Sequence, residues 1–494
     1  MSDTKRSNQI NFDNFKDYIK GEIKQSHNAS LAISIVSDKE VLFEEGFGFR
    51  DIPNKKPFTA ETVFPIGSHT KSFTATALAM LVDDGIIDWN TPIKDVISQF
   101  RLNDLFSNER CTLRDLLSHT TGLPHHQFVY MNGEWSYKDV FNRLPHLKSV
   151  YDFRTQHKYS NLNYIIATKI IEELSGQVYF DFMNERIFKP LGMKNTFFSI
   201  ADVFKTDNFT YGYKETEDGF LLEEYLDLKM ISAGAGSINS NLKDLGKWIQ
   251  FHVNKGKIAD KQLISEKTLS NLYVMQKLDR NPLGVFFPEK NYIRNYGFAL
   301  GWWTIDYRGM KMNQHYGTGP GLLFNGGFLP DNNIGYVIFS NTSGSDLPFY
   351  LNFFIVDQLL GLDVVQWGDE LRAFEIKQNE MMVKNKLELE ETQEMKTVNP
   401  SHPLEDFIGV YMHPGYGKLE FSLINNKLHA SYGKGSKVSI EHYNYDTFII
   451  KIEHLGDFGV SKFVTFRADF HGKITHIEID AEPLLKSTIF EKID

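Results

Sequence analysis

The sequence lacks the features that mark secreted, redox-active and membrane-spanning proteins. Cys111 is the only cysteine among the 494 residues, so no intrachain disulfide can form, and we expect a buried thiol rather than a reactive one. No stretch reaches the roughly 18 apolar residues that a membrane-spanning helix needs, and residues 1–15 contain no apolar core of a signal peptide. We therefore expect a soluble, cytoplasmic protein without a membrane partner.

Clusters of basic residues are missing as well. The formal net charge is −10, and no run is rich in lysine or arginine. A protein that binds the phosphate backbone of a nucleic acid needs a positively charged surface. The composition therefore argues against nucleic acid as a partner.

The residues that are present predict an α+β fold around an antiparallel sheet. Two β-rich runs, residues 30–37 and 40–49, flank the turn Asp38-Lys39, and strand signals return in residues 301–309, 321–330 and 334–341. Helical patterns dominate residues 68 to 290 and predict a mainly helical subdomain. We expect the early and late strands to join in one sheet that is flanked by helices.

The composition changes near the C-terminus. Residues 371–400 are predominantly charged and polar, which is typical of a linker, and we assign residues 1–370 to one domain. Short segments of residues 401–494 alternate apolar and polar side chains between turns such as Asn425-Asn426. This pattern predicts a separate, small all-β barrel.

The stretch PIGSHTKSFTATALAML, residues 65–81, places Lys71 in the first turn of a helix, where a cation is disfavoured. Ser-x-x-Lys occurs at Ser2, Ser68, Ser240 and Ser431, but only Ser68 opens a helix that is apolar on every side and therefore buried. Burial and the helix dipole lower a lysine pKa, so a neutral amine could take the serine proton. The spacing leaves two interpretations of Ser68 open, a nucleophile and a structural N-cap.

Two further motifs contain residues suited to acyl transfer. Tyr159 and Asn161 form a Tyr-x-Asn motif before a predicted helix, although Ser160 or Asn161 could equally be the N-cap of that helix. His315 and Gly317 form a His-x-Gly motif on a predicted strand. Each motif alone is weak evidence, and a lone histidine in a strand is usually structural.

In this order and with these surroundings, the three motifs resemble the serine β-lactamase/penicillin-binding protein superfamily, on the class C side that includes esterases and D-amino-acid peptidases. The resemblance covers about residues 15–360 and includes SAGAGSINSNLKDLGKW at residues 232–248 and HYGTGPG at residues 315–321. It implies the β-lactamase/transpeptidase-like fold. The last ninety or so residues are similar to the lipocalin-like domain often appended to such enzymes.

The resemblance also implies a role for each motif residue. Ser68 would attack a carbonyl, Lys71 and Tyr159 would share the proton, and Asn161 would orient Lys71 and the substrate amide. The backbone N–H groups of Ser68 and of Thr318, which follows Gly317, would bind the oxyanion. His315 would stand where penicillin-recognising relatives have the lysine of Lys-[Ser/Thr]-Gly, and Thr318 stands where many relatives have glycine. No cofactor and no metal are implied.

The resemblance favours a serine hydrolase that acts through a Ser68 acyl-enzyme on small esters or on (D-)amino-acid amides and peptides. One alternative is a β-lactamase or a penicillin-binding D-Ala-D-Ala carboxypeptidase, which is disfavoured because His315 is mostly neutral at pH 7 and would not provide a permanent cation for a carboxylate. Another is a non-catalytic protein that binds a small ligand. The expected partner is a small-molecule or peptide substrate, and a homo-oligomer is left open.

Overall fold

The structure is a computed structural model of the 494-residue chain. It describes residues 12–126, 129, 136–223, 233–279, 292–343, 346–363, 365–374, 376–377, 380–381, 398–433, 436–452, 461–482 and 484–493. Contacts within the chain divide it into two units, residues 1–90 with 164–378 and residues 91–163 with 379–494.

The first unit is built on a nine-stranded sheet in which every neighbouring pair of strands is antiparallel. The order is β10-β11-β12-β13-β14-β15-β1-β2-β3. The early and late strands meet where β1 pairs with β15, from Leu31 opposite Ser340 to Ser37 opposite Ile334. The prediction that the early and the late strands join in one sheet is therefore confirmed. The strands are β1 (Ser30–Ser37), β2 (Val41–Asp51), β3 (Lys56–Pro57), β10 (Lys277–Leu278), β11 (Ile293–Phe298), β12 (Trp303–Tyr307), β13 (Met310–Gly319), β14 (Leu322–Leu329) and β15 (Ile334–Ser340).

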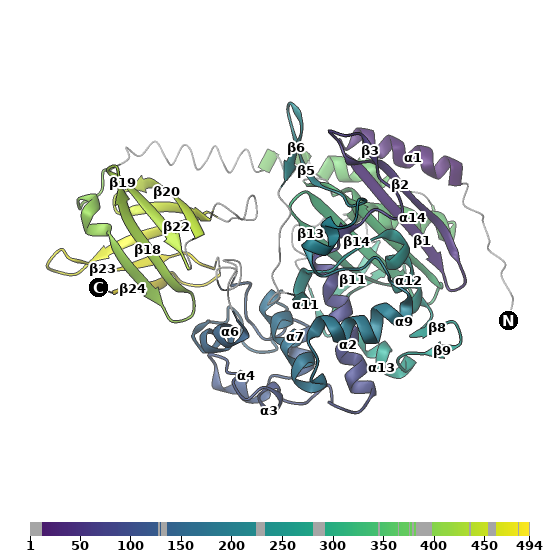
Figure 1. Ribbon diagram of the computed structural model, residues 1–494, viewed down its shortest axis with the longest axis horizontal. Helices are drawn as coiled ribbons and strands as arrows, with labels where there is room; N and C mark the ends of the chain where they lie inside the picture. Colours follow the sequence, from purple (N-terminus) through teal and green to yellow (C-terminus); the bar gives the residue numbers. More distant parts are fainter. Residues whose placement is uncertain are drawn as a thin grey trace. The chain divides into compact units, whose positions relative to one another are not determined.

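Helices cover both faces of this sheet (Figure 1). Successive side chains of a strand point to opposite faces. A Cβ atom on Gly335 of β15 would contact Ile249 in α12 (Leu242–Val253), whereas the next residue, Tyr336, lies within hydrogen-bond distance of Asn352 in α14 (Leu347–Leu360). Helix α1 (Phe12–Gln25) packs on the α14 side, where the ring of Tyr18 stacks on Phe354 at 4.0 Å. The sheet is thus the middle layer of the first unit.

Helix α2 (Thr70–Asp83) is buried at every position from Thr70 to Leu81, as its apolar sequence predicts. The ring of Phe73 stacks on Trp248 at 3.7 Å, and the hydroxyl of Thr74 lies 2.8 Å from that of Tyr179. The chain enters α2 from a short strand, β4 (Phe64–Pro65), which pairs with β7 (Asn239–Ser240). This pairing fixes the position of the helix start.

The other elements of the first unit are short. They are the 3-10 turns η1 (Gly67–His69) and η6 (Asn271–Tyr273), the π-helical turn η4 (Asn184–Phe188), the helices α8 (Tyr179–Met183), α9 (Lys189–Leu191), α10 (Ile200–Phe204), α11 (Ala233–Gly236) and α13 (Glu266–Ser270), and the strands β5 (Gly212–Thr216), β6 (Gly219–Glu223), β8 (Lys257–Ile258), β9 (Lys261–Gln262) and β16 (Thr342–Ser343).

The second unit combines a helical segment with the C-terminal residues. Its helical part contains α3 (Ile93–Val96), α4 (Leu105–Arg110), α5 (Leu113–Leu117), α6 (Tyr137–Arg143), the turn η3 (Leu144–His146) and the first residues of α7 (Asn161–Ser175), which continues into the first unit. Cys111 lies in this segment and is buried, as predicted, and burial raises the pKa of its thiol well above the ordinary value. A thiol that stays protonated is a poor nucleophile.

The C-terminal residues form a closed antiparallel barrel of eight strands, coloured from yellow-green to yellow in Figure 1. Strand β24 pairs back onto β17, with Val410 opposite Ile493, so the sheet has no free edge. Asn425 and Asn426 have positive φ angles of 50° and 58° between β18 and β19, as expected of a tight hairpin turn. The predicted barrel is confirmed. Its elements are η7 (Leu404–Phe407), β17 (Gly409–His413), β18 (Gly417–Ile424), β19 (Lys427–Tyr432), β20 (Ser436–Asn444), β21 (Thr447–Ile452), β22 (Lys462–Ala468), β23 (Ile474–Ile479) and β24 (Thr488–Ile493).

Within the second unit, His126 connects the helical segment to the barrel. Its Nε2 lies 3.1 Å from the carbonyl oxygen of Lys148 and its Nδ1 lies 2.7 Å from the hydroxyl of Tyr416. Because a carbonyl can only accept, Nε2–H donates to Lys148, and Nδ1 accepts from Tyr416. Burial is the largest cause that lowers the pKa of His126 to about 3, so the ring is neutral.

The division into residues 1–370, 371–400 and 401–494 stays a prediction, and residues 382–397 of the predicted linker lie outside the described residues. Among the helices of the described ranges, none is both long enough and apolar enough to cross a membrane.

We predict that Tyr416→Phe lowers the free energy of unfolding by about 1–3 kcal/mol, because the buried Nδ1 of His126 loses its hydrogen-bond donor. The measurement is urea denaturation followed by circular dichroism. Tyr445→Phe is the matched control, since the side chain of Tyr445 is 54% exposed, and it should change stability little. Equal stability of both variants and the unmodified protein would contradict the role of the His126–Tyr416 contact.

Candidate active site

Ser68 and Lys71 face one another at the start of α2. The Nζ of Lys71 lies 3.0 Å from the Oγ of Ser68 and 2.7 Å from the carbonyl oxygen of Ala235 in α11. A carbonyl oxygen can only accept a hydrogen bond, so Lys71 donates one N–H to the carbonyl of Ala235. Ser68 is partly exposed, whereas Lys71 is completely buried. A solvent-accessible hydroxyl is therefore paired with a buried amine.

Ser68 does not occupy an N-cap position, which was the structural alternative for this residue. The residue before η1 is Ile66 and the residue before α2 is His69, and neither position has a side-chain capping hydrogen bond. Ser68 lies inside the 3-10 turn, where its hydroxyl accepts from Lys71. The side chain of Ser68 thus faces the amine of Lys71 and does not accept a hydrogen bond from a backbone N–H at the helix start.

Burial lowers the pKa of Lys71 well below its ordinary value, in the direction predicted from the sequence. The ring of Tyr164 lies 5.5 Å from Nζ. A neutral amine has a lone pair that can accept the hydroxyl proton of Ser68, whereas an ammonium group has none. The desolvated position of Lys71 therefore gives it the chemistry of a general base.

His315 lies on strand β13, as predicted, and is also buried. Its Nδ1–H donates to the carbonyl oxygen of Tyr316 at 2.7 Å, while His69 donates from its own Nδ1 to the carbonyl oxygen of His315 at 3.0 Å. Burial, followed by the charges of Lys71 and His69, lowers the pKa of His315 well below its ordinary value. This position therefore provides no permanent cation.

Gly317 and Gly67 let β13 approach the turn that carries Ser68. A Cβ atom on Gly317 would lie 1.8 Å from the carbonyl oxygen of Ile66, and one on Gly67 would lie 2.9 Å from the backbone nitrogen of Thr318. The two backbones can come this close only because Gly317 and Gly67 have no Cβ atom. The peptide of Thr318 is thus beside the residue that precedes Ser68, which suits the predicted pair of oxyanion donors.

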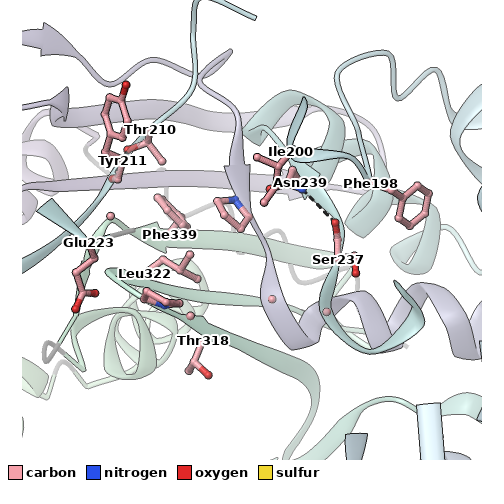
Figure 2. A pocket seen from close by; sticks show the side chains of 16 residues that line it. Phe198, Ile200, Thr210, Tyr211, Glu223, Ser237, Asn239, Thr318, Leu322 and Phe339 are labelled. Atoms are coloured by element: carbon pink, nitrogen blue, oxygen red, sulfur yellow. Dashed lines mark hydrogen bonds between the residues drawn. The ribbon is translucent and has the colours of Figure 1, made fainter. Parts of the chain in front are cut away.

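A pocket opens next to this turn, and Gly67 and Thr318 line it (Figure 2). Apolar side chains line much of the rest: Phe198, Ile200, Leu322 and Phe339. Two polar residues, Ser237 and Asn239, complete one wall, where the Nδ2 of Asn239 donates to the backbone oxygen of Ser237 at 3.1 Å. The turn that carries Ser68 is therefore adjacent to a mainly apolar cavity.

Tyr159 and Asn161 belong to the second unit. The ring of Tyr159 lies 4.4 Å from that of His119 and 5.6 Å from that of His125. Ser160 donates from Oγ to the carbonyl oxygen of Pro124 at 2.7 Å, so its side chain binds the neighbouring loop instead of the start of α7. The catalytic roles of Tyr159 and Asn161 stay predictions.

Three contributors to the site were not predicted from the sequence. They are the carbonyl of Ala235, the ring of His69 and the carboxylate of Glu223, which also lines the pocket. The stretch at residues 232–248 was recognised as similar to the family, but every residue type has a backbone carbonyl, so the sequence does not reveal which carbonyl contacts Lys71. Among the described residues, no group of three or more His, Cys, Asp or Glu side chains is placed to hold a metal ion.

We predict that Gly317→Ala destabilises the protein by about 1–3 kcal/mol and abolishes its activity, because the added methyl group would force β13 away from Ile66. Gly21→Ala in α1 is the control. A Cβ atom there meets nothing within 4 Å, so this change should raise stability by about 0.5–1 kcal/mol. Denaturation midpoints and ester hydrolysis measure both effects, and an active, stable Gly317→Ala variant would contradict the close approach.

Comparison with known proteins places this chain in a family. The profile described as Beta-lactamase matches residues 15–360, and one described as a domain of unknown function (DUF3471) matches residues 393–492. The chain is 28% identical over 461 residues to a protein from Aspergillus violaceofuscus named Unguisins hydrolase, an alignment that covers 86% of this chain and 80% of that protein.

Two solved structures share the fold. The octameric penicillin-binding protein homologue from Pyrococcus abyssi aligns with a TM-score of 0.62 at 21% identity, over 97% of this chain and all of that one. The D-amino acid amidase from Ochrobactrum anthropi SV3 aligns with a TM-score of 0.56 at 25% identity, over 70% of this chain and 98% of that one. The present chain therefore belongs to the β-lactamase family and is a hydrolase with the β-lactamase fold.

Proposed function

We propose that this protein is a serine hydrolase that cleaves small esters or (D-)amino-acid amides and peptides through an acyl-enzyme on Ser68. The observation that carries the proposal is the 3.0 Å contact between the hydroxyl of Ser68 and the completely buried amine of Lys71. A serine hydroxyl is a weak nucleophile until a neighbouring base removes its proton.

In the first step, Ser68 Oγ forms a bond to the carbonyl carbon of the substrate while the neutral Nζ of Lys71 takes the hydroxyl proton. The backbone N–H groups of Ser68 and Thr318 stabilise the oxyanion. When the tetrahedral intermediate collapses, the bond to the leaving group breaks and the leaving group receives the proton. Water then repeats the sequence on the acyl-enzyme, releasing the acid and restoring Ser68.

The resemblance to the family assigns the remaining motif residues. Tyr159 shares the proton with Lys71 and delivers it to the leaving group, and Asn161 orients Lys71 and the substrate amide. The phenolate of a tyrosine needs a nearby cation to serve as a base, and protonated Lys71 would provide one after the first transfer. His315 contributes to the site as a neutral group.

The relatives support an amide or peptide substrate over a β-lactam. One relative is named for the hydrolysis of unguisins, and one structural neighbour is named a D-amino acid amidase and was solved with L-phenylalanine amide. A β-lactam antibiotic carries a carboxylate, for which His315 provides no permanent cation.

The quaternary structure, the location and the division of the chain are also proposals. We propose a cytoplasmic enzyme whose residues 401–494 form a lipocalin-like domain after a 371–400 linker. Homo-oligomerisation is supported only by analogy, since one structural neighbour is described as octameric.

We predict that Ser68→Ala abolishes the hydrolysis of p-nitrophenyl esters and shifts the melting temperature by only a few degrees, because the hydroxyl is not a helix cap. A fluorophosphonate probe should add its mass to the unmodified protein and not to the variant. Ser431→Ala, which removes the serine of another Ser-x-x-Lys motif, is the control and should stay active. Full turnover by Ser68→Ala would refute the nucleophile, and binding without turnover by the unmodified protein would favour the non-catalytic alternative.

We predict that kcat/KM for ester hydrolysis falls as the pH decreases through the lowered pKa of Lys71, because protonation removes the lone pair that accepts the serine proton. Lys71→Arg should be inactive across the whole pH range, since a guanidinium stays protonated. Lys243→Arg, at an exposed lysine of another Ser-x-x-Lys motif, should keep the normal profile. If folded Lys71→Arg, checked by circular dichroism, retained activity at any pH, Lys71 would not be the base.

A further inference from the structure

Among the described residues, one contributes a charge to the pocket beside Ser68. Of the described residues that line it, Glu223 alone is an Asp, Glu, Lys or Arg. The other lining side chains are apolar, hydroxyl or amide groups, together with several glycines. A substrate group that enters this pocket therefore meets one negative charge and no positive charge among the described lining residues.

Glu223 is held in place by its strand. It ends β6 and lies opposite Gly212 in β5, and β5 in turn pairs in parallel with β16. The hydroxyl of Ser343 in β16 donates to Oε2 of Glu223 at 3.2 Å. A carboxylate can accept several hydrogen bonds, so this contact leaves acceptor positions for a substrate.

The carboxylate lies apart from two of the apolar side chains of the pocket, Phe198 and Ile200. Figure 2 shows Glu223 at one end, Phe198 and Ile200 at the other, and Thr318 between them. Because the peptide of Thr318 lies beside the turn that carries Ser68, a substrate held at its carbonyl could place a polar group toward Glu223 and an apolar group toward Phe198.

The reactive side of the site does not offset this negative charge. Lys71 and His315 are both buried, and burial holds the pKa of each well below its ordinary value. A substrate carboxylate in the pocket would therefore meet repulsion from Glu223 and no compensating cation in the part of the lining that the structure describes. An ammonium group would instead form a charge-assisted hydrogen bond.

We propose that Glu223 selects substrates that carry an ammonium group, either the free α-amine of an amino-acid amide or ester or the amine of a basic side chain. This inference rests on the proposed function, since it names the substrate class of the Ser68 site. Substrates with a blocked amine or with a carboxylate in this position are disfavoured.

The test compares matched p-nitroanilides on the full-length protein. One pair is phenylalanine p-nitroanilide and its N-acetyl derivative, in D and L forms. The other pair is Nα-acetyl-lysine p-nitroanilide and Nα-acetyl-norleucine p-nitroanilide. We expect the amine-bearing member of at least one pair to be cleaved with about tenfold or greater kcat/KM, mainly through a lower KM, as for a hydrogen bond to a charged group. The pair that shows the preference identifies the source of the amine.

Glu223→Gln should remove that preference and leave the uncharged substrates unchanged, whereas Glu223→Asp should retain part of it. Glu215→Gln is the matched control, because Glu215 lies on the same hairpin, in β5, but does not line the pocket. An unmodified protein that cleaves charged and uncharged substrates equally, or a Glu223→Gln variant that loses activity toward both alike, would overturn the inference. Ser68→Ala distinguishes the two proposals. If this variant cleaves none of the substrates and the unmodified protein shows no preference for amines, the acyl-enzyme on Ser68 is supported and the role of Glu223 is refuted.

Discussion

The site depends on the removal of Lys71 from water. An ammonium group at a helix start opposes the helix dipole, and the buried surroundings of α2 disfavour its charge. The amine is instead held by the carbonyl of Ala235 and directed at the hydroxyl of Ser68. The apolar surroundings of the helix therefore affect the protonation of this amine, because a lysine on a solvated face would stay protonated and could not accept a proton.

A second constraint is the close contact between backbones. Strand β13 reaches the turn of Ser68 only because Gly317 and Gly67 have no side chains at the points of contact. The nine-stranded sheet gives β13 a fixed register with β12 and β14 on either side. A strand held inside the sheet thus brings the peptide of Thr318 beside the turn that carries Ser68.

Ionisable side chains at the site of the first unit differ in burial. Burial lowers the pKa of Lys71 and of His315, whereas Glu223 lines the pocket at the end of a solvent-accessible hairpin. In the second unit, the neutral ring of His126 joins the segment that carries Tyr159 to the barrel through Tyr416. Desolvation therefore lowers a pKa in both units, that of Lys71 in one and that of His126 in the other.

The sequence alone determined the elements and the reactive residue types. The apolar run after Ser68 predicted a buried helix, the alternating C-terminal segments predicted a barrel, and the position of Lys71 predicted its lowered pKa. These features follow from local periodicity and from burial, which residue type largely sets. The tertiary structure decided that the carbonyl of Ala235 holds Lys71 and that Glu223 lines the pocket. The contact between Lys71 and Ala235 joins residues 164 positions apart, and neither a backbone oxygen nor a single carboxylate has a sequence pattern that reveals its partner.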